Sequence, residues 1–350
     1  MAPTGIRASG TRKKRRPCCG DLLSGIGMLG GKMHPIVKLV GQRLGLGLLL
    51  LLAVSALIFI GVELLPGDVA QAILGQSATE TSLRNLREEM GLDQPALTRY
   101  FSWLWGIVHG DLGVALSNKQ DIAADIGERL GNTLFLAFWA AVVAVPLAIS
   151  LGLLAVRYRN RWPDRLISGV TLATISLPEF VVGYILMYLL TVKFRVFSPI
   201  STIYDGMSLG ERLYAIALPV MVLVLVVLAH MMRMTRAAIL NVMQSAYIET
   251  AELKGLRPLT IIARHAFPNA LAPVVNVVML NLAYLVVGVV VVEVVFVYPG
   301  MGQYLVDHVA KRDIPVVQAC GLIFAAVYIG LNIFADVISI LTNPRLRHPK

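Results

Sequence analysis

The chain has 350 residues, of which 57% are hydrophobic and only 15% are charged. Soluble domains are about 45–50% apolar and about 25% charged, so this composition excludes an ordinary soluble domain. It also excludes disorder over most of the chain, and three cysteines are too few for a disulfide scaffold. The net charge of +10 does not predict a nucleic-acid partner, because membrane proteins concentrate Lys and Arg in cytoplasmic loops.

The first segment, residues 1–34, is basic, rich in glycine and without hydrophobic periodicity, so we predict a disordered tail. Its Cys18-Cys19 pair makes a poor zinc site, because a structural zinc needs four ligands. Residues 35–65 form the first predicted transmembrane helix. The apolar run is too long for a signal peptide, whose apolar core is about 7–15 residues, so we expect a retained anchor.

Six apolar runs reach the roughly 20 residues that a helix needs to cross a bilayer. They are Leu44–Leu65, Thr133–Val156, Ile167–Val192, Leu213–Met232, Ala270–Val297 and Val316–Leu341. We therefore predict an all-α polytopic protein with six transmembrane helices in a lipid bilayer. The segments between the runs hold 21 Lys and Arg on one side and 10 on the other, which places both termini in the cytoplasm.

Residues 66–126 form the one large external loop, which contains two amphipathic helix patterns. The apolar positions are Leu83, Leu86 and Met90, then Leu97, Phe101, Leu104 and Val108. Gly91 and Gly110 follow as stops. Tyr100, Trp103 and Trp105 suit a helix at the membrane interface.

Residues 127–341 form the predicted five-helix core, and 342–350 form a cytoplasmic tail. The largest loop between the spans on the basic side, residues 233–269, reads as a helix from Asn241 to Lys254, a stop at Gly255 and a second helix from Pro258. Such a structured loop with few charges should dock on a partner.

The motifs of catalysis are absent from the sequence. It has no G-x-x-x-x-G-K-[ST], no H-E-x-x-H, and no G-x-S-x-G with a matching His and acid. The six histidines lack metal-ligand spacing, so we expect no metal site and no catalytic residue. Energy for any transport must come from a gradient or from a partner.

The loop 245–273 resembles the EAA loop of ABC importer permeases, E-A-A-x-x-x-G-x9-I-x-L-P. Glu249, Ala251, Gly255 and Pro268 keep the spacing, and Thr250 replaces the first Ala. The form T-A-x-x-K-G-L, which ends in Lys254, Gly255 and Leu256, is similar to the dipeptide, oligopeptide and nickel branch.

Further motifs of that branch follow in chain order. They are Leu65-Pro66-Gly67-Asp68, Gly91-Leu92-Asp93-Gln94-Pro95, Gly110-Asp111-Leu112-Gly113, Ser176/Pro178/Phe180/Gly183, Glu293/Phe296, Pro299-Gly300-Met301-Gly302 and Arg312-Asp313-Ile314-Pro315. The chain ends in Asn343-Pro344-Arg345 where the family usually has Asp-Pro-Arg.

This resemblance implies a type I ABC importer permease fold in the bacterial inner membrane. It implies a second homologous permease, two cytoplasmic ATPases that hold ATP and magnesium and grip the EAA loops, and a periplasmic binding protein. This chain itself would bind no cofactor. Dipeptides, oligopeptides, glutathione, nickel, opines and sugars remain open as cargo. The rival functions are a stand-alone secondary transporter or channel, and a membrane scaffold.

Intramembrane acids are candidates for function, because a carboxylate at bilayer depth costs at least about 2.5–3.5 kcal/mol. Glu179, together with Ser176, Pro178 and Phe180, is a candidate for the translocation path, where its carboxylate would meet a substrate amine. The alternatives for Glu179 are packing against the second permease and satisfying backbone freed by Pro178. For Glu293 and Asp336 we expect helix-bundle packing with polar partners, Asn332 in the case of Asp336. For Asp68 and Asp111 we expect turn chemistry, with substrate contact as the alternative.

Overall fold

The computed structural model describes residues 35–64, 70–71, 78–89, 91, 93–204 and 206–342. The predictions for the tail 1–34 with Cys18 and Cys19, for the motif at 65–68, for Met90 and Leu92, and for residues 343–350 lie outside this part of the chain.

The described residues are built almost entirely from helices. These are α1 (Pro35–Glu63), α3 (Glu80–Glu89), α4 (Ala96–Val108), α5 (Ile122–Arg157), α6 (Trp162–Ser176), α7 (Glu179–Met187), the π-helix η2 (Tyr188–Lys193), α8 (Leu209–Ala215), α9 (Ala217–Met243), α10 (Ala246–Leu253), α11 (Pro258–Thr260), the π-helix η3 (Ile261–Ala266), α12 (Phe267–Val295), α13 (Met301–Ala310) and α14 (Ile314–Thr342). Among them, five stretches are long and apolar enough to span a membrane on their own: Val40–Glu63, Ile122–Arg157, Ala217–Met243, Pro258–Val295 and Ile314–Ile338. The predicted all-α membrane fold is confirmed.

The third predicted span, Ile167–Val192, is not one straight helix. It is divided into α6 and α7, which meet at an angle of 103°. Pro178 disfavours the helical conformation at Leu177, which is extended instead with φ −96° and ψ 133°. Hydropathy alone does not register the break, since both halves are apolar.

Three other boundaries differ from the sequence prediction. The predicted helix Asn241–Lys254 is interrupted at Gln244 and Ser245, so that α9 ends before α10 begins. Ser208 and Glu211 form a capping box that starts α8 as a separate helix ahead of α9. The helix α5 begins before its apolar run, because the Asp121 carboxylate accepts a hydrogen bond from the Ala123 N–H at 3.0 Å.

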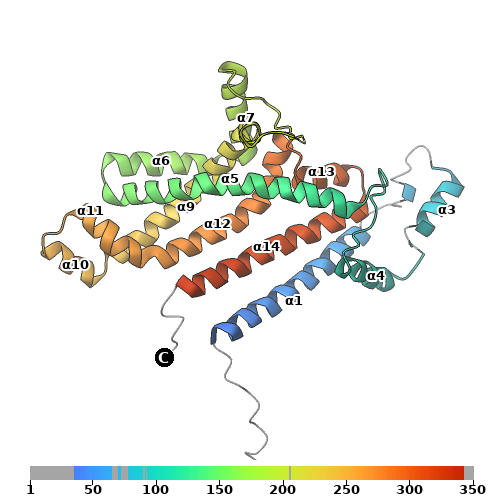
Figure 1. The fold of residues 1–350 in the computed structure, drawn as a ribbon, viewed down its shortest axis with the longest axis horizontal. Helices are drawn as coiled ribbons and strands as arrows, with labels where there is room; N and C mark the ends of the chain where they lie inside the picture. Colours follow the sequence, from blue (N-terminus) through green and yellow to red (C-terminus); the bar gives the residue numbers. More distant parts are fainter. Residues whose placement is uncertain are drawn as a thin grey trace, which may run out of the picture.

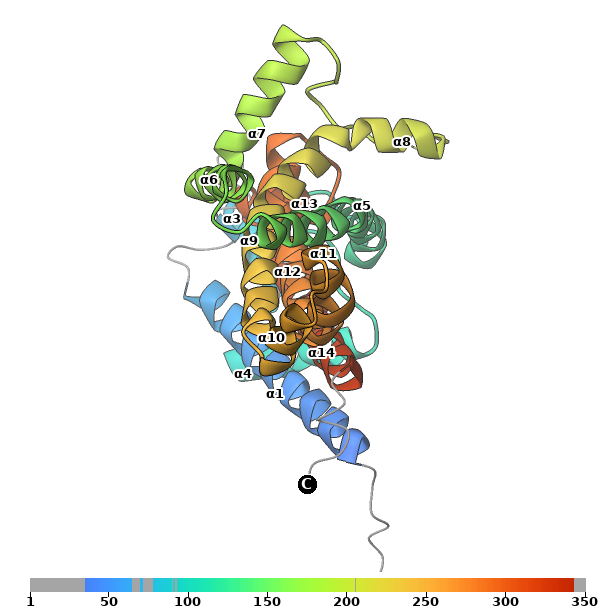
Figure 2. The ribbon, with the colours of Figure 1, turned by 90° about the vertical axis from the view of Figure 1, so that its left-hand side faces the viewer.

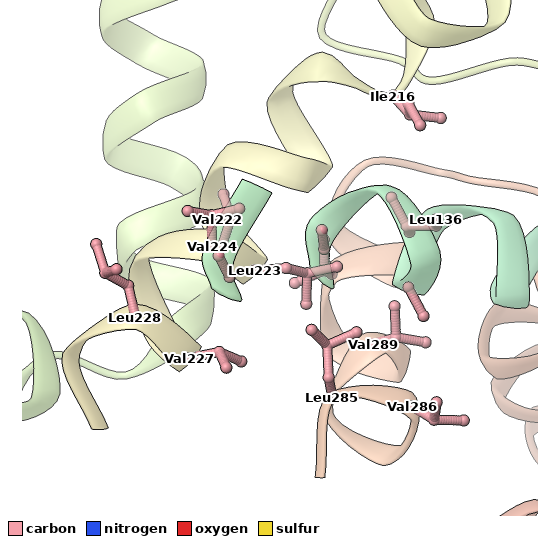
Figure 3. Close-up of a cluster of buried hydrophobic side chains, with 14 of the residues drawn as sticks. Leu136, Ile216, Val222, Leu223, Val224, Val227, Leu228, Leu285, Val286 and Val289 are labelled. Atoms are coloured by element: carbon pink, nitrogen blue, oxygen red, sulfur yellow. The ribbon is translucent and has the colours of Figure 1, made fainter. Parts of the chain in front are cut away.

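The centre of the molecule is the packing of α5, α9 and α12. A row of small residues on α5, Ala140, Ala144, Ala148 and Gly152, is buried and allows close helix approach. A Cβ on Gly152 would lie 3.1 Å from Thr235 Cγ2 on α9. Figure 3 shows Leu136 of α5, Val222 and Leu223 of α9, and Val289 of α12 in the resulting cluster.

The long helices run between two ends of the molecule. The α5–α6 junction and the α10–α11 turn lie at one end, and α13 and α4 lie at the other (Figure 1). We call the first the basic end, because Arg157, Arg159, Arg161, Arg257 and Arg264 belong to it. The helices α7 and α8 project from the same side of the bundle (Figure 2).

Candidate coupling and translocation site

The helix α10 ends in a complete Schellman motif. The Leu256 N–H donates to the Ala251 carbonyl at 3.3 Å, and the Gly255 N–H donates to the Glu252 carbonyl at 2.9 Å. Gly255 has φ +74°, a conformation that favours glycine, which confirms the predicted stop. Arg257 is extended, and Pro258 then occupies the first turn of α11. The chain therefore turns sharply between α10 and α11 at the basic end.

The helix α10 has one buried face. Ile248 and Ala251 pack in a cluster with Ile239 of α9, Val156 of α5, and Ile262 at the start of the next helical segment. The helix α10 packs against η3, which in turn contacts α9 and α12 at the centre of the bundle. Of the predicted docking residues, Ala251 belongs to this inward face.

The opposite face of α10 and its corner is exposed. Glu249, Thr250, Lys254, Gly255 and Leu256 all lie there, together with apolar side chains that the sequence analysis did not single out. These are Tyr247, Leu253 and Leu259, of which Leu253 is 83% exposed. This exposed set, with apolar side chains beside charged ones, is what we call the corner surface. Exposed apolar side chains grouped on one surface, with polar side chains beside them, indicate a candidate protein contact.

The residues predicted to line the translocation path meet at the α6–α7 break. Ser176 is the last residue of α6, and its hydroxyl donates to the Leu172 carbonyl at 2.9 Å. Pro178 is the N-cap of α7, with Glu179 as its first residue and Phe180 exposed next to it. All four predicted side chains therefore belong to one bend.

The Glu179 side chain extends over α12. A Cβ added to Gly288 would lie 3.9 Å from Oε2 of Glu179. Gly288 lies two turns before the end of α12. The distance along the helix axis is about 10 Å at 1.5 Å per residue. Among the described residues, no hydrogen bond or ion pair is made by this carboxylate. The backbone freed by Pro178 is thus not its partner, and the path and the second permease remain as the two interpretations.

The Glu293 carboxylate is fully buried and satisfied by three donors. It accepts from Thr133 Oγ1 at 2.6 Å, from the Gly302 N–H at 2.7 Å and from the Gln303 N–H at 3.2 Å. The last two donors belong to the first turn of α13, so the carboxylate caps that helix. The predicted role of Glu293 in packing agrees with this geometry.

The glycines of the Pro299-Gly300-Met301-Gly302 motif are required by close approach to Glu293. A Cβ on Gly300 would overlap the carboxylate, and one on Gly302 would lie 2.7 Å from Val290 Cα. The Pro299 carbonyl accepts from Asn132 Nδ2 at 3.0 Å, which ties the motif to α5.

The remaining motif residues stabilise the same end of the molecule. Asp313 is buried and accepts from the backbone N–H groups of Leu116 at 3.2 Å and Ser117 at 2.9 Å. Arg312, beside it, is exposed and has φ +56°. Asp111 accepts from the Gly113 N–H at 2.9 Å, which is the predicted turn chemistry.

Asp336 does not pair with Asn332. Its carboxylate lies 3.2 Å from the Arg43 guanidinium of α1, whereas Asn332 donates to the Tyr328 carbonyl. The partner lies on another helix, which intrahelical spacing cannot reveal.

The sequence analysis also missed an ion pair at the basic end. Arg236 Nε donates to Asp164 Oδ1 at 3.0 Å and Nη2 donates to Oδ2 at 2.8 Å. Asp164 is buried and also accepts from the Asn160 N–H at 3.0 Å. The available signal was an acid within a strongly basic loop, which contains Arg159, Arg161 and Arg165.

No group of three or more His, Cys, Asp or Glu in the described part of the chain is placed to hold a metal ion.

The architecture is that of a polytopic membrane transport subunit that presents a fixed helical corner at one end. The profile of the family "Binding-protein-dependent transport system inner membrane component" matches residues 144–348, and the N-terminal profile of the same membrane component matches residues 36–137. The chain belongs to this family, the inner-membrane permeases of ABC importers. This membership excludes the stand-alone transporter.

Relatives of known name agree with the family. The glutathione transport system permease protein GsiC of Escherichia coli O6:H1 is 35% identical over 298 residues, which cover 85% of this chain and 95% of that protein. A Brucella abortus protein that carries the name of a peptide transport system permease is 33% identical over 313 residues, covering 89% and 100%. A solved structure of the MetNI methionine transporter aligns over 69% of this chain and 98% of its own with TM-score 0.44 and 18% identity, too distant to add to the assignment.

Proposed function

We propose that this permease moves di- or oligopeptides, or a related small solute such as glutathione, into the cytoplasm as one of two homologous permease subunits. Support for the cargo class comes from the relatives, whose names specify glutathione and peptides. The two solutes share a free amine, carboxylates and amide bonds. This chain would bind no cofactor, and two ATPase subunits would hold ATP and magnesium.

The observation that carries the mechanism is the two-faced helix α10. We infer that an ATPase subunit grips the corner surface through Leu253, Tyr247 and the charged side chains beside them. Ile248 and Ala251 on the buried face then transmit the movement through η3 to α9 and α12. Ala251 acts from inside the chain and does not touch the ATPase.

The orientation follows from the charge asymmetry. The basic end, with the corner surface, faces the cytoplasm, where ATP is available. The α13 end, which is tied together by Glu293 and Asp313, faces the periplasm and the substrate-binding protein.

The path would run beside the α6–α7 bend. Glu179 lies at membrane depth without a partner among the described residues, so its carboxylate is available to a substrate amine. Phe180 and Ser176 on the same bend would provide an apolar contact and a small polar one.

The proposal is tested with the assembled complex in proteoliposomes. The permease is co-expressed with a second permease, two ATPases and a binding protein of the same transport system. ATP hydrolysis and uptake are then measured with glutathione, a dipeptide and a longer peptide. We expect hydrolysis that rises on addition of the loaded binding protein, and uptake of at least one of the three. Hydrolysis unaffected by all three cargos would reject the peptide class.

A further inference from the structure

The helix α4 has three distinct faces. At about 100° per residue, which follows from 3.6 residues per turn, Leu97, Phe101, Trp105 and Val108 fall within about 80° of one another. Thr98, Ser102 and His109 occupy the adjacent strip. Leu104, which is half-buried, borders the first set on its other side, and the remaining side chains point away from both. We call the first set the apolar stripe and the second the polar edge.

The third face of α4 is fixed to α1 near Glu63. Tyr100 and Ser55 share a hydrogen bond of 2.8 Å between their hydroxyls, and Arg99 forms an ion pair with Glu63. Phe59 of α1 contacts the rings of Tyr100 and Trp103, with centroids 5.4 and 6.3 Å apart. The position of α4 relative to the spanning helix is thus determined by polar and aromatic contacts.

The apolar stripe has no protein cover among the described residues. Its four side chains are between 63% and 73% exposed. Thr98, Ser102 and His109 of the polar edge are exposed as well. A helix with an apolar stripe beside a polar edge suits the boundary between acyl chains and water.

The exposed apolar surface of α1 next to the stripe indicates that lipid covers the stripe. The Val40–Glu63 segment of α1 is long and apolar enough to span a membrane, and only 6% of its most apolar stretch is buried within the described protein, so its surface is available to lipid. Leu57, Ile60 and Leu64 on its last turns are more than half exposed. The stripe therefore begins beside an apolar surface at the end of a span.

We propose that the apolar stripe of α4 inserts into the leaflet at the Glu63 end of α1 and contacts lipid acyl chains. The polar edge faces the headgroups and water. Trp105 is the interfacial anchor, whereas Tyr100 and Trp103, which sequence alone also suggested for this role, pack on α1 instead. The attachment of α4 then determines how deeply α1 sits in the membrane. This inference does not depend on the cargo or on the ATPases.

The test places spin labels on neighbouring positions of the stripe and the edge. Phe101→Cys and Ser102→Cys are made in the full chain with Cys18→Ser, Cys19→Ser and Cys320→Ala, and reconstituted in nanodiscs of phosphatidylethanolamine and phosphatidylglycerol. Collisions with oxygen and with a water-soluble nickel chelate are compared. Leu57→Cys provides the lipid reference and Gln120→Cys the water reference.

We expect the label at Phe101 to match Leu57, with oxygen favoured, and the label at Ser102 to shift toward Gln120. A Phe101 label that matches Gln120 would show a stripe in water and overturn the proposal. A Phe101 label protected from both reagents would show a covering protein and overturn it equally.

A second measurement does not require the substitution of the buried Cys320. With Trp103, Trp139 and Trp162 replaced by Phe, brominated lipid should quench the fluorescence of Trp105. With Trp105 replaced and Trp103 retained, the same lipid should quench Trp103 less. Equal or reversed quenching would contradict the assigned faces.

Discussion

Arg236 of α9 and Asp164 of α6 form a bidentate ion pair, with bonds of 3.0 and 2.8 Å, beside the basic end of the bundle. The Asp164 side chain is 6% exposed and that of Arg236 is 26% exposed. Parallel bonds between a guanidinium and a carboxylate are strong and geometrically specific. The pair therefore fixes α6, which leads into the bend at Glu179, to α9, which leads into α10.

Asp164→Ala should destabilise the protein, because it leaves the Arg236 guanidinium without its partner. Breaking a fully buried pair costs about 3–5 kcal/mol, and we expect a smaller loss here because Arg236 is partly exposed. The melting temperature in detergent, measured for both single variants and for Asp164→Ala/Arg236→Met, checks this. The double variant should recover part of the loss, and strictly additive losses would show that the pair is not coupled.

Glu293→Ala should weaken the attachment of α13 to α5. Removing the carboxylate leaves the Gly302 and Gln303 N–H groups and the Thr133 hydroxyl without their acceptor, at about 1–3 kcal/mol for each unsatisfied buried group. Glu293→Gln keeps an acceptor oxygen for α13 and should cost less. The melting temperatures of the two variants test this capping role. A Glu293→Ala variant as stable as the wild-type protein would contradict it.

Glu179→Gln should lower the uptake of peptides with a free amine while leaving assembly of the complex intact. The charge is lost, but the volume and the bend at Pro178 are kept. Thr174→Ala is the matched control, because the Thr174 hydroxyl donates to the Val170 carbonyl of its own helix and Thr174 is not among the predicted path residues. Its loss should change uptake little. Loss of assembly in Glu179→Gln would favour an interface with the second permease, and wild-type uptake would rule out the path role.

Cysteines introduced at Gln120 and Arg257 should differ in their reaction with an impermeant maleimide. In cells whose outer membrane is permeable and whose inner membrane is intact, Gln120→Cys should react and Arg257→Cys should not. The reason is that 21 of the 31 basic residues place the Arg257 side in the cytoplasm. The experiment uses the variant without native cysteines. The reverse pattern would invert the orientation.

The features that the sequence predicted well are those encoded locally. The stop at Gly255, the start at Pro258 and five of the spans each depend on a residue type or a run of neighbours. The ion pairs Arg43–Asp336 and Arg236–Asp164 join different helices, so a single sequence gives them no spacing to detect. The break at Gln244 and Ser245 has neither Gly nor Pro. Which face of α10 is exposed depends on the packing of α5, α9 and α12, so the sequence alone could not place Ala251 on the buried side of its helix.

The central claim is that the turn at Gly255 passes movement between an ATPase and the bundle. A Cβ there meets no atom of the described residues within 4 Å, so the effect of a substitution comes from the backbone. With φ +74°, an L side chain costs roughly 1–2 kcal/mol, more if it is β-branched, whereas Asn tolerates this conformation. Gly255→Asn is therefore the matched control for Gly255→Val.

The most direct measurement is the uptake of cargo per ATP hydrolysed by the reconstituted complex carrying each of these two substitutions. Both variants should insert in the membrane normally, because the spanning helices are untouched. Gly255→Asn should keep most of the wild-type ratio. Gly255→Val should either fail to retain the ATPases or hydrolyse ATP with little uptake. A Gly255→Val complex that transports at the wild-type ratio would contradict the account.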